Sequence, residues 1–202
     1  MRKLLWLNPV VKNMYDFSTL KELLQNKGFN IVECERDHVC DVKNSYKNLC
    51  SKGMVLDSRC PRAVNFIRSN FKEFSNNISS LNPILIESAI ELSSKLKEDE
   101  WLYITTPCDD LAELGDSLKL ERTTFLTWKN FKELNDINLQ INKIESSPIP
   151  PGFFENLGIK TLSLCSKEKI QNAFSYKFSE LKNYHIIELL YCENGCHNGD
   201  GL

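Results

Sequence analysis

The chain has 202 residues, and its 42% hydrophobic content is enough to build a sizeable core in one domain or in two small lobes. A formal net charge of −2 gives no positive electrostatic field that would attract nucleic acid. The sequence also has no run of basic residues that would bind an anionic membrane. Asn8 and Pro9 end the apolar run near the N-terminus, and no later stretch approaches membrane-span length. We therefore expect a cytoplasmic protein with neither nucleic-acid nor membrane partners.

Short apolar runs and amphipathic segments alternate along the chain. Strands are predicted at residues 3–7, 29–33, 54–56, 101–105, 123–127, 161–164 and 186–191. Helices are predicted at residues 16–27, 37–52, 61–71, 83–96, 128–134, 153–157 and 166–181, and residues 135–152 are predicted to be loop. This order predicts an α/β fold with two lobes of mainly parallel, doubly wound sheet flanked by helices. We place the lobes at roughly residues 1–80 and 81–202.

Residues at the ends of these segments support the helix predictions. Asp16, Thr127 and Ser166 are suited to cap helix N-termini, and Pro61 suits the first turn of a helix. Helical spacing predicts that Val39 and Ile90 face the core. Asp109 and Asp110 are expected at a helix start.

Eight cysteines raise the question of disulfides or metal. Long amphipathic segments and the absence of a secretory signal argue against a disulfide scaffold, so metal binding or plain burial remains. Cys60 and Cys108 each stand next to a proline at the end of a predicted strand, and Cys192 and Cys196 follow the last strand. Since the carboxyl ends of parallel strands meet at one edge, these residues form a candidate four-thiolate set. The helix N-terminus after Cys60 is expected to favour its thiolate.

The other cysteines are expected to be buried without a ligand role. Cys34 and Cys40 with His38 between them could bind a metal, but a strand end and a helix start direct their side chains differently. Cys50 and Cys165 lack convergent partners in the sequence.

Three segments that carry the four cysteines resemble the catalytic-domain family of iron-only (FeFe) hydrogenases. The family motifs have the forms Thr-Ser-Cys-Cys-Pro, Met-Pro-Cys-x-x-Lys-x-x-Glu and Glu-x-Met-x-Cys-x-x-x-Cys-x-x-Gly-Gly-Gly. The corresponding segments here are Asp57-Ser-Arg-Cys60-Pro61, Thr106-Pro-Cys108-Asp-Asp-Leu111-Ala-Glu113-Leu114 and Glu188-Leu-Leu190-Tyr-Cys192-Glu-Asn-Gly-Cys196-His-Asn-Gly199-Asp-Gly201. The resemblance covers nearly the whole chain.

The resemblance implies a 4Fe–4S cluster between the two lobes. Cys60, Cys108, Cys192 and Cys196 would be its ligands, with Cys196 in the position that bridges to a two-iron subsite in the family. The family's C-terminal helices are missing, which predicts that this is one domain of a longer protein.

Residues that serve the two-iron subsite in the family are replaced here. Arg59 replaces the family's proton-donating cysteine. Leu111 and Leu114 replace the lysine and the glutamate that follow the second ligand in the family, and Glu113 lies one position before Leu114. Thr106 and Leu190 stand where the family has two methionines that pack against the two-iron subsite. A permanently protonated guanidinium cannot relay protons at neutral pH, and a leucine cannot hold an anionic diiron group. These changes predict that hydrogen turnover is lost, and they make a diiron subsite doubtful.

The expected function is a non-catalytic 4Fe–4S module with a redox, electron-transfer or sensory role. Its partner would be a redox protein such as ferredoxin, or a fused signalling domain. The alternatives are an active FeFe hydrogenase that uses ferredoxin, and a zinc-binding or metal-free α/β binding domain.

Two further side chains near the ligands have open interpretations. Arg59 is either solvated or a donor that tunes the cluster's potential. His197 either donates to a cluster sulfur, replaces a proton relay, or is a surface residue of the glycine-containing loop.

Overall fold

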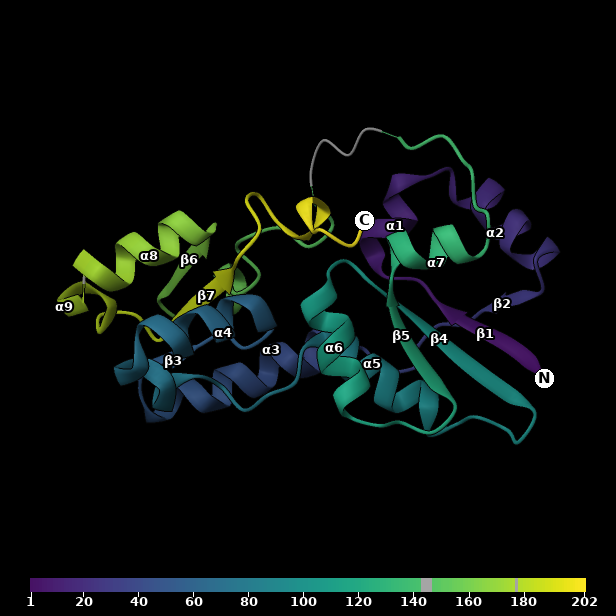
Figure 1. Ribbon diagram of the computed structural model, residues 1–202. Helices are drawn as coiled ribbons and strands as arrows, with labels where there is room; N and C mark the ends of the chain where they lie inside the picture. The colour runs from purple at the N-terminus through teal and green to yellow at the C-terminus, as the bar shows by residue number, and fades with distance from the viewer. Residues whose placement is uncertain (143–146, 177) are drawn as a thin grey trace. The chain divides into compact units, whose positions relative to one another are not determined.

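The computed structural model describes residues 1–142, 147–176 and 178–202 (Figure 1). Residues 143–146 of the expected loop and residue 177 of the expected last long helix lie outside the described residues. The chain forms two compact units, which are unit 1 (Met1–Arg36, Leu85–Pro148 and Cys196–Leu202) and unit 2 (Asp37–Ile84 and Ile149–Gly195). This division differs from the expected lobes of residues 1–80 and 81–202. Parallel strand pairing between distant segments, rather than sequence order, builds each unit.

Unit 1 contains a four-stranded parallel sheet with the order β2-β1-β4-β5. Its strands are β1 (Arg2–Trp6), β2 (Phe29–Ile31), β4 (Glu100–Thr106) and β5 (Thr123–Thr127). β1 pairs with both β2 and β4, and Leu4 lies opposite Leu102 in the β1–β4 register. Both sides of this central strand are therefore filled by parallel neighbours.

Helices cover both faces of the unit 1 sheet. They are α1 (Pro9–Met14), α2 (Phe17–Asn26), α5 (Ile84–Ser93), α6 (Asp109–Ser117) and α7 (Trp128–Leu134). Even-numbered strand residues such as Leu102 and Ile104 pack in one core cluster with Ile86 of α5 and Leu111 of α6. Odd-numbered residues project from the opposite face, where Tyr103 packs near Phe131 of α7 with ring centroids 6.4 Å apart. Unit 1 is therefore doubly wound, as predicted.

Unit 2 contains a three-stranded parallel sheet with the order β3-β7-β6. Its strands are β3 (Val55–Leu56), β6 (Thr161–Cys165) and β7 (Ile186–Leu190). β7 is buried along its whole length and pairs with β3 on one side and β6 on the other. This central strand joins residues 149–195 to the earlier segment 37–84.

Unit 2 also has helices on both faces of its sheet. They are α3 (His38–Leu49), α4 (Pro61–Asn70), α8 (Lys167–Tyr176) and α9 (Phe178–Leu181), with short 3-10 helices at η1 (Cys50–Lys52), η2 (Lys72–Asn77) and η3 (Glu155–Leu157). One core cluster joins Leu56 and Leu189 to Ile67 of α4 and Phe174 of α8. A second cluster on α3 contains Tyr46, which packs with Phe154 at a ring-centroid distance of 4.7 Å.

Local signals located most element boundaries correctly. Asp16 accepts a hydrogen bond from Thr19 N at 2.9 Å, Thr127 accepts one from Asn130 N at 3.2 Å, and Ser166 accepts one from Lys169 N at 3.2 Å. Pro61 occupies the first turn of α4. The N-cap predictions are therefore confirmed.

Other local expectations were wrong or missed an element. Helix α1 was not predicted, although Asn8 caps it by accepting from Val11 N and Pro9 opens it. Val39 is 45% exposed and Ile90 is 36% exposed, so neither faces the core as expected. The helical period predicted a buried face for these side chains, but within the described part of the chain no neighbouring element covers that part of the face.

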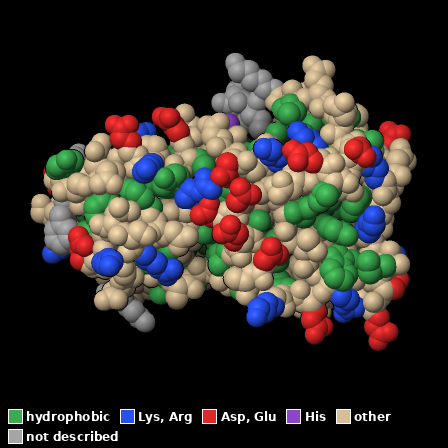
Figure 2. Space-filling view, viewed as in Figure 1, with side chains coloured by type: hydrophobic (Ala, Val, Ile, Leu, Met, Phe, Trp, Pro, Cys, Tyr) green, Lys and Arg blue, Asp and Glu red, His purple; other side chains and the backbone are tan. Residues whose placement is uncertain are grey.

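Charged side chains of both signs are interspersed over the face shown in Figure 2. That mixture agrees with the small net charge of −2. Among the described residues, no helix is both long and apolar enough to cross a membrane.

Candidate functional site

Cys60 and Cys192 lie at the carboxyl ends of two paired strands in unit 2. Cys60 follows β3 and is the N-cap of α4, while Cys192 comes two residues after β7. The Cys60 sulfur accepts backbone N–H groups from Ala63 and Tyr191, and the charge of Cys192 raises its pKa, so the two thiols are within electrostatic reach. The pairing of β3 with β7 thus brings these two predicted ligands together.

The expectation of an easily formed thiolate at Cys60 is wrong. Burial raises the pKa of Cys60 to about 11, and it outweighs the two N–H groups, which lower the pKa. A buried sulfur of this kind becomes a stable thiolate when a cation compensates its charge. Metal binding at Cys60 stays a prediction.

Cys108 and Cys196 lie in unit 1, on two segments that are hydrogen-bonded to each other. Cys108 follows β4 and is the N-cap of α6, where its carbonyl accepts from Thr106 Oγ1 at 2.9 Å. Cys196 begins the short 3-10 helix η4 (Cys196–Asn198). Beyond it, Gly201 N donates to Pro107 O at 3.1 Å, next to Cys108. The last residues of the chain are therefore attached to the turn that carries Cys108.

Two glycines make this attachment sterically possible. A Cβ atom on Gly199 would lie 2.1 Å from the carbonyl oxygen of Pro107, a contact that backbone atoms do not tolerate. A Cβ atom on Gly201 would lie 2.6 Å from Thr127 Cγ2 and 3.0 Å from the backbone nitrogen of Cys108. The loop can approach Cys108 closely because both residues lack a side chain.

His197 follows Cys196, and its Nδ1 atom is buried without a hydrogen-bond partner among the described residues. A buried imidazole nitrogen normally has a hydrogen-bond partner, and this atom can either donate or accept one. His197 as a whole is half-buried, so the interpretations of its role stay predictions.

The four predicted ligands thus form one pair in each unit. Cys60 and Cys192 belong to unit 2, and Cys108 and Cys196 belong to unit 1. All eight cysteines are outside disulfide bonds. Four thiols on loops at strand ends, with glycines that fit close backbone approach, match the donor set of an iron–sulfur cluster held by four cysteines. The union of the two pairs in one site stays a prediction.

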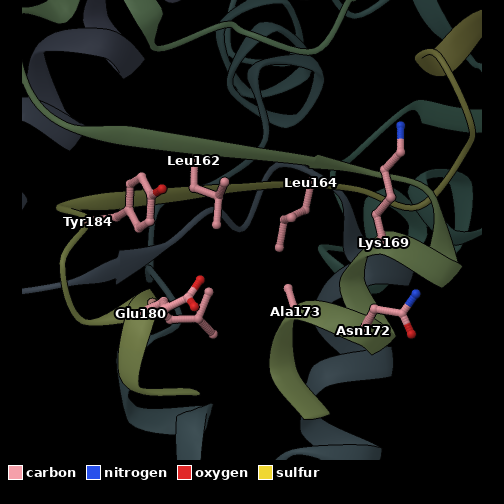
Figure 3. Close-up of a pocket in the computed structure, with 8 residues that line it drawn as sticks. Leu162, Leu164, Lys169, Asn172, Ala173, Glu180 and Tyr184 are labelled. Atoms are coloured by element: carbon pink, nitrogen blue, oxygen red, sulfur yellow. The ribbon is translucent and has the colours of Figure 1, made fainter. Parts of the chain in front are cut away.

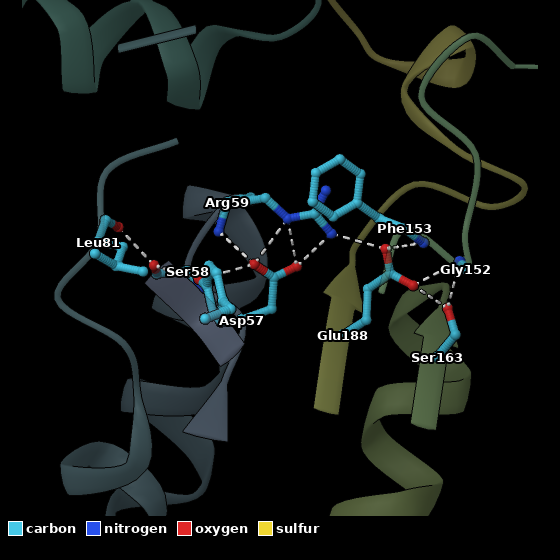
Figure 4. A network of polar contacts seen from close by, with 9 residues as sticks. Asp57, Ser58, Arg59, Leu81, Gly152, Phe153, Ser163 and Glu188 are labelled. Atoms are coloured by element: carbon cyan, nitrogen blue, oxygen red, sulfur yellow. Dashed lines mark hydrogen bonds and ion pairs between the residues drawn. The ribbon is translucent and has the colours of Figure 1, made fainter. Parts of the chain in front are cut away.

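Arg59 is buried in a polar network rather than solvated (Figure 4). Its side chain is 8% exposed, and its Nη2 atom donates to Asp57 Oδ2 at 2.8 Å and to Glu188 Oε1 at 2.7 Å. Its guanidinium carbon lies 3.8 Å from the ring centroid of Phe153 and 4.6 Å from that of Phe154. The solvated interpretation of Arg59 is therefore wrong.

Both carboxylates of this network have further donors. Asp57 accepts from Tyr46 Oη and from the backbone nitrogen of Arg59, each at 3.0 Å. Glu188 accepts from Gly152 N at 2.6 Å and from Phe153 N at 3.1 Å, and Ser163 Oγ also donates to it. Figure 4 shows the Glu188 carboxylate between the arginine on one side and the 152–153 backbone on the other.

The network keeps Arg59 protonated. Burial alone lowers the pKa of Arg59, but the charges and hydrogen bonds of Asp57 and Glu188 outweigh it and raise the pKa above its ordinary value. Arg59 is therefore a fixed cation at the carboxyl ends of β3 and β7, directly before Cys60.

Sequence reasoning missed the partners of Arg59. Glu188 is a lone carboxylate among the apolar residues of β7, and it is 1% exposed. Since a buried charge requires a partner, an acidic residue inside an apolar strand was the signal that could have located this network.

Most residues at the other family motif positions are buried, and Leu111 and Leu114 are part of an apolar core. Leu111 is 7% exposed and belongs to a core cluster of unit 1, and Leu114 packs against that cluster. Leu190 is 3% exposed, Thr106 is fully buried, and Glu113 is exposed. The two leucines of α6 are therefore hydrophobic packing groups without cation or proton-transfer chemistry.

A pocket of about 270 Å³ in unit 2 is separate from these residues (Figure 3). Leu162 and Leu164 of β6 form one wall, and residues of α8 and α9 with Tyr184 form the rest. Strand alternation directs these leucines away from the sheet face that carries Ser163 and Cys165. The pocket therefore does not adjoin the Arg59 network.

Parallel sheets flanked by helices define an α/β fold, and this fold is similar to that of solved FeFe hydrogenases. Neither a protein family nor a curated protein matches the sequence of this chain.

The similarity is found among solved structures at low sequence identity. One similar structure is an FeFe hydrogenase described for oxygen inactivation by modification and degradation of the H cluster 2Fe subcluster, with a TM-score of 0.66, 10% identity, and coverage of 99% of this chain and 80% of that chain. Another is HydA(deltaEFG), described for stepwise assembly of the H cluster, with a TM-score of 0.64, 12% identity, and coverage of 99% and 79%. A variant of HydA1 from Chlamydomonas reinhardtii has a TM-score of 0.64, 12% identity and the same coverage.

Proposed function

We propose that this chain is a 4Fe–4S cluster-binding module of hydrogenase-like fold that does not turn over hydrogen. Cys60, Cys108, Cys192 and Cys196 would hold the cluster. The observation that carries the proposal is a set of four free cysteines, of which Cys60, Cys108 and Cys192 follow parallel strands and Cys196 begins η4.

The surroundings of these cysteines support cluster binding. The Cys60 sulfur already accepts two backbone N–H groups, and N–H donors to sulfur are a means by which proteins set the potential of iron–sulfur clusters. Gly199 and Gly201 let the last loop pack on the backbone beside Cys108. The cluster would supply one-electron redox chemistry, and the chain would hold it and adjust its potential.

The loss of hydrogen turnover is supported by the residues at the catalytic motif positions. Arg59 is a paired, permanently charged group that cannot deliver a proton at neutral pH. Leu111 offers only a packed aliphatic side chain where the resemblance implies a cation for the diiron group. Arg59 forms ion pairs within unit 2, and Leu111 packs in the apolar core of unit 1.

The role that follows is electron transfer or redox sensing. A redox protein such as ferredoxin, or a signalling domain fused to this chain, would exchange electrons with the cluster. We place the module in the cytoplasm because four free thiols persist in a reducing compartment.

Anaerobic purification and reconstitution test the proposal directly. We expect about four irons and four sulfides per chain, and an EPR signal of a cubane in the reduced protein. Cys60→Ser should lower the iron content, while Cys40→Ser, a change at an exposed cysteine of α3, should leave it unchanged. Protein without iron after reconstitution, or equal iron in both variants, would contradict cluster binding at these residues.

An active hydrogenase is the second candidate, because solved FeFe hydrogenases have similar folds. Protein matured by the hydrogenase assembly machinery should show no hydrogen evolution with reduced ferredoxin if the proposal holds. Hydrogen evolution, together with the EPR signature of a diiron subsite, would establish the active enzyme instead.

Zinc is the chemical competitor, since four thiolates also suit a tetrahedral zinc site. Elemental analysis of anaerobically produced protein separates the two metals. One zinc per chain with no sulfide would replace the proposed cluster by a structural zinc site, and no metal at all would indicate a metal-free binding domain.

A further inference from the structure

Cys165 ends strand β6 and is buried, with 5% of its surface exposed. It lies opposite Leu190 in the β6–β7 register. Alternation along the strand places Cys165 on the same sheet face as Ser163, whose hydroxyl Figure 4 shows directed at Glu188. This buried thiol therefore lies on the sheet face that carries Glu188, at the strand end beside the Cys192 loop.

The Cys165 thiol both donates a hydrogen bond to that loop and accepts hydrogen bonds from it. Its Sγ atom donates to the carbonyl oxygen of Cys192 at 3.1 Å, and the backbone N–H groups of Asn194 and Gly195 donate to the sulfur. One side chain from β6 thus contacts three residues of the loop. A simple buried cysteine would pack against apolar groups instead.

The loop has an unusual backbone conformation at two successive residues. Asn194 has φ 58° and Gly195 has φ 117°, so two successive residues have positive φ values. Glycine adopts positive φ values without strain, and asparagine is one of the few other residues that also adopt them. The backbone N–H groups of such turns converge on one concave side and bind an electron-rich atom there. The sulfur of Cys165 occupies that position.

We infer that Cys165 is a positioning residue for Cys192. By bonding the Cys192 carbonyl and the next N–H groups, it fixes the turn at residues 192–195 and thereby the direction of the Cys192 thiol near Cys60. The consequence for a bound cluster rests on the proposed function. The role of Cys165 in fixing the turn does not rest on the proposed function, because it follows from contacts within unit 2 alone.

Hydrogen exchange measured on the protein as purified tests the positioning itself. Cys165→Ala removes both the S–H donor and the sulfur acceptor, so amide exchange at Asn194 and Gly195 should become about five- to tenfold faster. Cys165→Ser keeps a donor and an acceptor of smaller size, and it should restore exchange to within about twofold of the wild-type rate.

Cys50→Ala is the matched control. Cys50 is also a buried thiol of unit 2, 6% exposed, and it donates to a backbone carbonyl, that of His185, at 3.6 Å. Its removal should leave exchange at Asn194 and Gly195 unchanged. Equal exchange in the wild-type protein and the Cys165→Ala variant would overturn the inference, as would equal acceleration by Cys165→Ala and Cys50→Ala.

A second readout uses the reconstituted protein and separates this inference from the proposed function. Cys165→Ala should release iron to a chelator about five- to tenfold faster than wild type, while Cys165→Ser and Cys50→Ala should not. If exchange at the turn changes but no variant or wild-type protein binds iron, the proposed function fails and the positioning role stands. If iron binds and neither exchange nor iron release responds to Cys165→Ala, the positioning role fails alone.

Discussion

Replacing Glu188 by glutamine is the sharpest test of the buried network in unit 2. The change keeps the shape of the side chain but replaces one acceptor oxygen by an NH2 group and removes the negative charge. In the wild-type protein this carboxylate accepts from Arg59 at 2.7 Å, from Gly152 N at 2.6 Å and from Phe153 N at 3.1 Å. A single amide oxygen cannot satisfy all of these donors.

The expected cost follows from the burial of these groups. Glu188 is 1% exposed and Arg59 is 8% exposed, so a lost partner is not replaced by water. Removing one partner of a buried ion pair typically costs about 3–5 kcal/mol, and we expect about 3 kcal/mol because one acceptor oxygen and the Asp57 partner of Arg59 remain. With an m-value of about 2 kcal/mol/M, the urea midpoint should fall by about 1.5 M.

Urea unfolding followed by far-UV circular dichroism measures this midpoint. Glu33→Gln is the matched control, since Glu33 pairs with Lys12 at 2.6 Å but is 57% exposed. Its free energy of unfolding should change by less than about 0.5 kcal/mol. A Glu188→Gln midpoint within about 0.2 M of wild type, or a shift equal to that of Glu33→Gln, would refute the assignment of the network as a buried structural ion pair.

Three further predictions concern other parts of the chain. Gly115→Ala would place a Cβ atom 2.2 Å from Phe125 Cδ1, so it should destabilise unit 1 by about 1–3 kcal/mol in urea unfolding, and an additional Phe125→Leu change should recover part of this loss. Gly199→Ala should break the contact with Pro107 and accelerate exchange of the backbone amides in residues 199–201, and an unchanged exchange rate would contradict the close approach. The hydrogen bonds from Thr19 lower the pKa of Asp16 to about 2, so its stabilisation is present above about pH 4 and is lost as pH falls toward 2. Thermal melts should show this pH dependence weakened in Asp16→Asn, which keeps the cap without the charge, and identical profiles would refute the role of the carboxylate.

Local residue patterns predict the order of strands and helices and most of their ends. Hydrophobic period and capping groups act within a few residues, which is why Asp16, Thr127 and Pro61 indicated helix starts correctly. The same local reasoning placed Cys60 and Cys108 at strand ends. The alternation of strands and helices also predicted a parallel sheet, because strands that are connected by helices run in the same direction.

Which distant segments meet depends on long-range pairing. Local patterns cannot show that β7 inserts between β3 and β6, and this pairing assigned residues 149–195 to the same unit as residues 37–84. It also gave Arg59 its partner Glu188, separated from it by 129 residues, and brought the sulfur of Cys165 to the Cys192 loop. Burial and charge compensation depend on such long-range pairing, so the difference between a solvated arginine and a buried ion pair is not encoded in any local window of the sequence.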